Sequence, residues 1–106
     1  MLAKIQLPPT AKPGEVIELR ITIQHPMETG FRYEIGGRPV PKNVIHSLVA
    51  RYNGSEIFRA EMDSGIAANP YLQFYAVATQ SGEIEFSWVD EAGERGVERA
   101  AISVTD

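Results

Sequence analysis

The sequence predicts an all-β fold, an immunoglobulin-like antiparallel β-sandwich of about seven strands. Short runs that alternate apolar and polar residues recur along the chain, and turn signals separate them at spacings of about 8–12 residues. No segment has the periodicity of an amphipathic helix. The length of 106 residues fits one domain, residues 1–106, built around one core.

The first strands are predicted in the N-terminal part of the chain. Residues 3–7 alternate weakly and stop at Pro8-Pro9, which cannot continue a hydrogen-bonded ladder. Pro13-Gly14 is typical of a turn. Residues 16–24 then alternate strictly, so that four apolar side chains share one face of a half-buried strand. These four are Ile17, Leu19, Ile21 and Ile23.

The middle of the chain predicts a hairpin. Residues 44–52 and 55–62 flank Asn53-Gly54, and this dipeptide suits a two-residue type I′ turn because both residues readily adopt positive φ angles.

Three further strands are predicted over residues 71–79, 83–90 and 97–104. In the first of them either face suits the core, because both faces carry apolar side chains. In the second, Ile84, Phe86 and Trp88 alternate with polar residues, and we expect Trp88 to anchor the core. Residues 91–96, a charged segment that contains glycine, are predicted to form the turn between the last two strands.

Composition limits the chemistry that the chain offers. There are no cysteines, so the chain supplies no thiol nucleophile, disulfide or iron–sulfur ligand. The net charge of −4 argues against nucleic acid as a partner. Residues 1–60 hold eight Lys and Arg against five Asp and Glu, whereas residues 61–106 hold two against nine. We predict no membrane span and no export signal in this sequence.

No catalytic, metal or cofactor site is predicted. His46 lies in a predicted strand next to Ser47, and adjacent strand residues point to opposite faces, so they cannot form a base and nucleophile pair. His25 ends a strand before a proline, where structural and partner-binding roles are both open. His25 and Glu28 alone are too few ligands for a metal, and no glycine-rich phosphate loop occurs.

Two long segments, residues 25–43 and 64–70, break the alternation, and loops of this length in a small domain usually carry function. Met27, Phe31 and Tyr33 form either an apolar contact patch or a cover over the end of the sandwich. Asn69 and Pro70 set the entry to a strand from which Tyr71 can reach a partner.

Several segments together carry a family resemblance. They are His25-Pro26-Met27-Glu28-Thr29-Gly30, the Asn53-Gly54 turn, Ala67-Ala68-Asn69-Pro70-Tyr71-Leu72 before Phe74-Tyr75, and Ser81-Gly82 with Phe86-Ser87-Trp88. Over nearly its whole length the chain resembles the SoxZ family, small subunits of the sulfur-compound carrier in Sox thiosulfate oxidation.

The resemblance implies a non-catalytic sandwich that binds SoxY, whose mobile C-terminal Gly-Gly-Cys-Gly-Gly arm carries sulfur intermediates covalently. Other Sox enzymes, including a haem-bearing sulfur transferase and a sulfate-releasing hydrolase, act in turn on that arm. It also implies a periplasmic location, reached by export together with a signal-bearing SoxY.

We therefore expect an apolar surface of the sandwich to bind a SoxY-type carrier, and the two long segments to meet other Sox enzymes transiently. The expected partner-binding residues are His25, Pro26, Met27, Glu28, Phe31, Asn69 and Tyr71. We expect His25→Ala to leave the fold intact and to weaken docking.

Two alternatives are a small hydrolase or metal-dependent enzyme centred on His25 and Glu28, and a free-standing ligand-binding or adhesion sandwich. Without its partner, the chain is also a candidate for self-association through the uncovered apolar surface.

Overall fold

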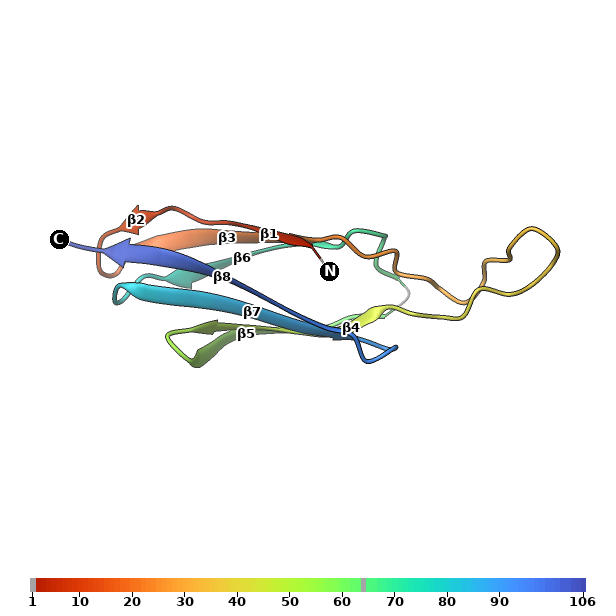
Figure 1. The fold of residues 1–106 in the computed structure, drawn as a ribbon. Coiled ribbons are helices and arrows are strands. Elements are labelled where there is room, and N and C mark those ends of the chain that lie inside the picture. Colours follow the sequence, from red (N-terminus) through yellow and green to blue (C-terminus); the bar gives the residue numbers. More distant parts are fainter. Residues whose placement is uncertain (1, 64) are drawn as a thin grey trace.

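The computed structural model describes residues 2–63 and 65–106, and over these residues the chain is a sandwich of two β-sheets without helices. Figure 1 shows the two layers, with β1, β3 and β6 above and β8, β7, β4 and β5 below. The strands are β1 (Ala3–Gln6), β2 (Thr10–Ala11), β3 (Val16–Ile23), β4 (Ile45–Tyr52), β5 (Ser55–Glu61), β6 (Tyr71–Val77), β7 (Gly82–Asp90) and β8 (Arg95–Val104). The predicted fold class is confirmed.

The three-stranded sheet has the order β1-β3-β6, and both pairings are antiparallel. The strict alternation in β3 buries every second side chain, as the sequence predicts. Its register with β6 places Leu19 opposite Phe74 on the inner face. The inner face of β6, which the sequence left open, is therefore the one that carries Leu72, Phe74 and Ala76.

The five-stranded sheet has the order β2-β8-β7-β4-β5. In the β4–β5 hairpin, Asn53 and Gly54 have φ angles of 48° and 86°, which confirms the predicted turn. The short β2 is an additional strand that the sequence did not predict. It pairs parallel with β8 after the chain has passed from one sheet to the other at Pro8-Pro9, and the Pro9 carbonyl accepts a hydrogen bond from Ser103.

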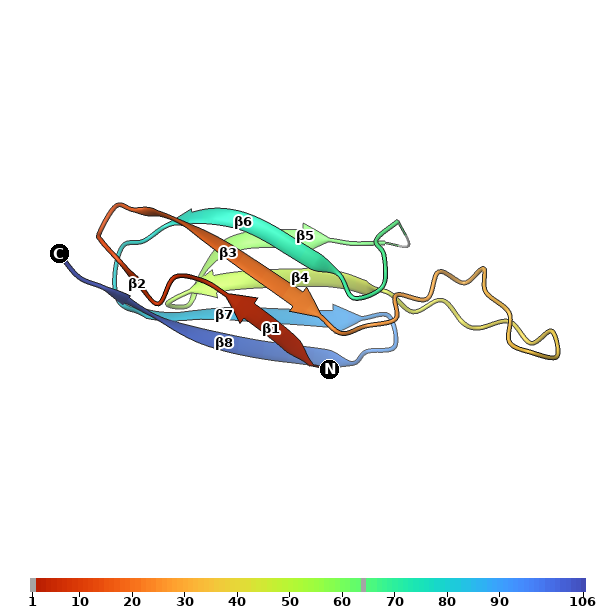
Figure 2. The ribbon, with the colours of Figure 1, turned by 90° about the horizontal axis from the view of Figure 1, so that it is seen from above.

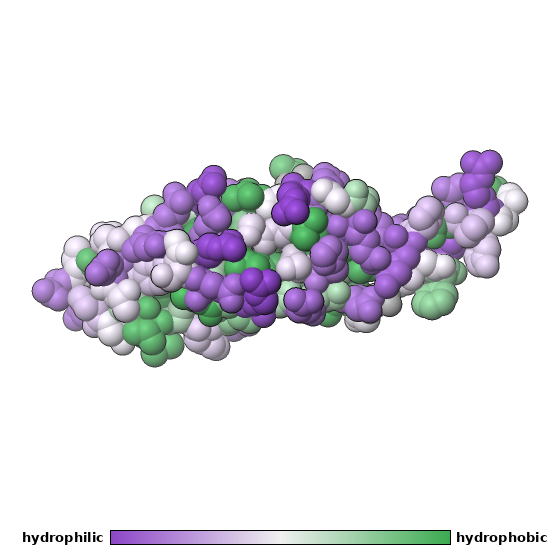
Figure 3. All heavy atoms as spheres, turned by 90° about the horizontal axis from the view of Figure 1, so that it is seen from below, coloured by the Kyte–Doolittle hydropathy of each residue, from purple (hydrophilic) through white to green (hydrophobic). Residues whose placement is uncertain are grey.

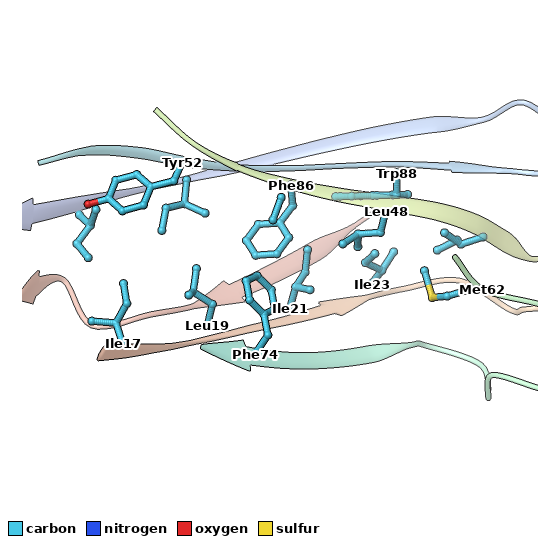
Figure 4. Close-up of a cluster of buried hydrophobic side chains, with 14 of the residues drawn as sticks. Ile17, Leu19, Ile21, Ile23, Leu48, Tyr52, Met62, Phe74, Phe86 and Trp88 are labelled. Carbon is cyan, nitrogen blue, oxygen red and sulfur yellow. The ribbon is translucent and has the colours of Figure 1, made fainter. Parts of the chain in front are cut away.

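The core lies between the two sheets (Figure 4). Phe74 stacks on Phe58 with ring centroids 4.2 Å apart and meets Phe86 at 5.9 Å, so aromatic rings join the sheets near the centre. Trp88 is 3% exposed and lies over Gly96, which confirms its predicted place in the core.

A long arm extends from one end of the sandwich. Figures 1 and 2 show the chain between β3 and β4 leaving the body as two roughly parallel segments that meet at a distal turn. The molecule measures 61 × 19 × 18 Å, and its radius of gyration is 16.3 Å, against about 13 Å for a compact chain of this length. The described residues contain no helix long and apolar enough to cross a membrane.

Candidate protein-interaction site

A buried histidine lies just before the arm. His25 follows β3 and is 3% exposed. Its Nδ1 accepts a hydrogen bond from the backbone N–H of Met27 at 2.9 Å. Nδ1 is therefore unprotonated, Nε2 carries the proton, and Nε2–H donates to Oδ2 of Asp90 at 3.1 Å. Both ring nitrogens are thus occupied inside the protein.

Asp90, the last residue of β7, is a carboxylate that is 1% exposed. Besides His25, it accepts hydrogen bonds from the backbone N–H of Glu94 at 2.9 Å and from the side-chain amide of Asn43 at 3.4 Å. Burial alone would raise the pKa of Asp90, but these hydrogen bonds outweigh it and lower the pKa below its ordinary value. The carboxylate is thereby kept ionised in a buried position.

Neighbouring residues tie further segments to the same point. Met27 has a positive φ of 50°, is 3% exposed, and accepts the N–H of Ile45 on its sulfur at 3.2 Å. Asn69, at φ 54°, accepts the His25 N–H on its side-chain oxygen at 3.1 Å and donates its own N–H to the His25 carbonyl at 2.7 Å. The arm, the loop before β6 and the turn after β7 are thus joined, and we call this junction the arm root.

The arm itself, residues 28–43, is an irregular hairpin. Glu28 and Asn43 exchange two backbone hydrogen bonds of 2.9 and 2.8 Å, and Val40 donates to the Arg32 carbonyl at 2.9 Å. Arg32 also binds the Glu28 carboxylate at 2.7 Å, and this hydrogen bond lowers the pKa of Glu28. These contacts give the arm a defined course away from the body.

The arm exposes large apolar side chains. Phe31 is 83% exposed, Tyr33 is 66% exposed, and Ile35 at the distal turn is fully exposed. We call these three residues the apolar row. Ile35 was not among the residues predicted from sequence, although the alternation of Phe31, Tyr33 and Ile35 with charged residues is itself a strand-like signal.

A second exposed apolar surface is the outer face of the three-stranded sheet. We call it the tyrosine face, and it carries Val16, Tyr71, Tyr75 and Val77, each at least half exposed. The Tyr75 hydroxyl donates to Glu18 at 3.2 Å, which holds that ring across two strands. A hollow of about 410 Å³ lies at the arm end of this face. It is lined by Leu2, Ala3, Lys4, Thr22, Gln24 and Asn69.

Comparison with known proteins identifies the family. The family model described as "Sulphur oxidation protein SoxZ" matches residues 5–101. The chain belongs to the SoxZ family. A search of curated protein sequences gives no match.

Solved structures show the same fold at low sequence identity. The superoxide reductase (neelaredoxin) from Ignicoccus hospitalis is 18% identical with a TM-score of 0.77, over 99% of this chain and 81% of that one. The sulfur carrier protein SoxY from Chlorobium limicola f thiosulfatophilum is 8% identical with a TM-score of 0.67, over 98% of this chain and 79% of that one. At such identities the similarity concerns the fold alone.

The residues predicted to bind partners fall into two groups in this SoxZ-family chain. Pro26, Phe31, Asn69 and Tyr71 are exposed and Glu28 is partly exposed, so each presents surface. The side chains of His25 and Met27 are instead buried in the arm root, and their contacts are with this chain. No group of three His, Cys, Asp or Glu side chains suited to a metal is found over residues 2–63 and 65–106.

Proposed function

We propose that this SoxZ-family chain is the non-catalytic subunit of a sulfur-compound carrier and binds a SoxY-type protein, whose C-terminal cysteine holds the sulfur group covalently. The observation that carries the proposal is the family match over residues 5–101, which spans both sheets and the arm. Other Sox enzymes then dock transiently through residues 25–43 and 64–70. The pair works in the periplasm, which this subunit enters bound to its partner.

The tyrosine face is the surface that best suits the permanent partner. Tyr71 and Tyr75 are half to two-thirds exposed on a rigid sheet, and tyrosine is enriched in protein interfaces because it buries a large ring and retains a hydroxyl. Val16 and Val77, paired across β3 and β6, extend the apolar area. A stable pair needs about 800 Å² on each side, and the hollow beside this face adds further surface for a partner.

Size-exclusion chromatography of the chain mixed with a SoxY-type protein tests the proposal. We expect one co-eluting species at micromolar concentration, and weaker binding for the double variant Tyr71→Ser and Tyr75→Ser. The matched control is Val97→Ser, an apolar residue 48% exposed on the opposite sheet. Two separate elution peaks for the unaltered chain would refute the proposal, as would sulfur-compound turnover by the chain alone.

Location requires its own experiment. Cell fractionation should find the chain in the periplasm when the SoxY-type protein is co-expressed with its signal sequence. Periplasmic recovery that does not depend on this partner would contradict the proposed shared export.

A further inference from the structure

We infer that the arm is a second docking element, separate from the tyrosine face, whose apolar row enters an acid-rimmed apolar groove of an enzyme that acts transiently on the carried sulfur group. This inference rests on the proposed function, because it requires a carrier pair that an enzyme visits. It adds which residues make the contact, the chemistry of the complementary surface and the transient character of the complex.

The first support is the way the row is presented. Phe31 and Tyr33 lie two residues apart on the outgoing segment of the arm, and Ile35 follows at the distal turn. Nothing in the described part of the chain covers them, since the three are 66% or more exposed. Figure 3 shows hydrophobic surface on the flank of the arm and hydrophilic surface at its tip.

The second support is the fixed root of the arm. Both ends of the arm are tied to the body, the start through the preceding His25 and Met27 and the end through Asn43, whose amide binds Asp90. Farther out, Gly30 has a φ of 91°, and a Cβ at its position would come within 3.1 Å of the Lys42 Cβ. A row held in a defined direction loses less conformational entropy on binding than a flexible loop does.

A proline limits the backbone contacts that the returning segment of the arm permits. The backbone groups of Arg38 and Val40 face the outgoing segment, where they bond Glu34 and Arg32. Residue 39 lies between them and faces outward, and it is a proline, which has no N–H. At this position the arm therefore donates no ladder hydrogen bond to a strand from another molecule, a second copy included. We assign recognition to the exposed side chains of the apolar row, seated in a groove.

Charge and area indicate the kind of partner. The arm holds three basic residues against two acidic ones in a chain of net charge −4. Arg32 binds Glu28, and Lys42 binds Asp63, whereas Arg38 near the tip has no carboxylate partner among residues 2–63 and 65–106. A groove with carboxylates at its rim complements this tip. Three side chains of this kind bury on the order of 500 Å² on the arm's side, less than a stable interface needs, so the complex is transient.

Steady-state kinetics with the assembled carrier pair as substrate test the inference. The enzyme is the haem-bearing sulfur transferase of the same Sox system, and the variant is the double substitution Phe31→Ser and Tyr33→Ser. We expect KM for the carrier pair to rise about tenfold with kcat within about twofold, because only docking is lost. Arg38→Glu should raise KM in the same direction, whereas Val97→Ser should leave both constants unchanged.

The outcomes separate this inference from the proposed function. Failure of the unaltered chain to co-elute with the SoxY-type protein refutes the proposed function. Intact co-elution with an unchanged KM in the double variant and in Arg38→Glu refutes the arm inference alone. If the double variant loses co-elution, or if it abolishes a dimer that the unaltered chain forms by itself, the row is covered by the carrier or by a second copy, and the inference is wrong.

Discussion

The burial of His25 reverses one expectation from sequence, because His25→Ala should now destabilise the fold itself. The substitution leaves the buried Met27 N–H without its acceptor and removes one of the three donors to Asp90. An unsatisfied buried donor costs about 1–3 kcal/mol, and losing a hydrogen bond to a buried charge costs about 1.5–3 kcal/mol. We expect the free energy of unfolding to fall by about 3–5 kcal/mol, a large part of what a domain of this size has.

Urea unfolding followed by the fluorescence of Trp88 measures this loss. Trp88 is the only tryptophan of the chain, is 3% exposed and lies two residues before Asp90 on β7. Asp90→Ala and the double variant complete a cycle in which we expect a coupling of about 1–3 kcal/mol, since the two side chains touch. His46→Ala, at an exposed histidine, is the control and should stay within about 0.5 kcal/mol. A loss below about 1 kcal/mol for His25→Ala, or no coupling, would refute the assigned role of the pair.

Three further predictions concern stability. The folded state lowers the pKa of Asp90, so the ionised carboxylate stabilises the fold above the ordinary carboxyl pKa of about 3.9, and this stabilisation is lost as pH falls through the folded pKa. The difference in unfolding free energy between the unaltered chain and Asp90→Asn should therefore shrink on acidification, and a constant difference would contradict this. Gly96→Ala places a Cβ against the indole of Trp88 and should lower the unfolding free energy, measured in urea, by at least about 1–3 kcal/mol. Gly65→Ala, with open space around it, is the control and should be close to neutral. Equal effects of the two substitutions would be inconsistent with this packing. Tyr52→Phe removes a hydroxyl that accepts hydrogen bonds from the backbone N–H groups of Thr79 and Gln80, at 3.2 and 3.1 Å. The substitution should lower the unfolding free energy by about 1–3 kcal/mol, and an unchanged unfolding midpoint would argue against these hydrogen bonds.

Local pattern predicted most of the sandwich because strand alternation and turn chemistry are properties of neighbouring residues. The alternation of β3 and the Asn53-Gly54 turn are both decided within a few positions, and both appear in the structure. β2 escaped because a two-residue strand has no measurable period, and its pairing with β8 joins residues about ninety positions apart in the chain. The inner face of β6 likewise depended on its register with β3, which alternation in β6 alone does not contain.

The arm root was harder to foresee, because its partners come from three distant segments. The sequence marked His25 and Asn69 as candidates, but it gave no sign that Asp90 would meet the imidazole. Asp90 sits at the end of a predicted strand before a charged turn, a position that usually faces solvent. Its burial results from the way the turn after β7 folds back, where the Glu94 N–H donates to the Asp90 carboxylate.

The buried pair of His25 and Asp90 is best explained by the orientation that it gives to the arm, rather than by the stability that it adds. Well-packed apolar residues stabilise a core about as well as a buried polar pair, but they leave orientation less defined, because hydrogen bonds need fixed angles and apolar contacts do not. At the arm root, Asp90 binds His25, just before the arm, and Asn43, at the end of the arm, so a single carboxylate holds both ends of the hairpin. Because the hairpin extends away from the body, any small rotation at its base becomes a large displacement at Phe31 and beyond. The polar root therefore gives the exposed apolar row a defined place in space, which a transient docking element with little buried area requires.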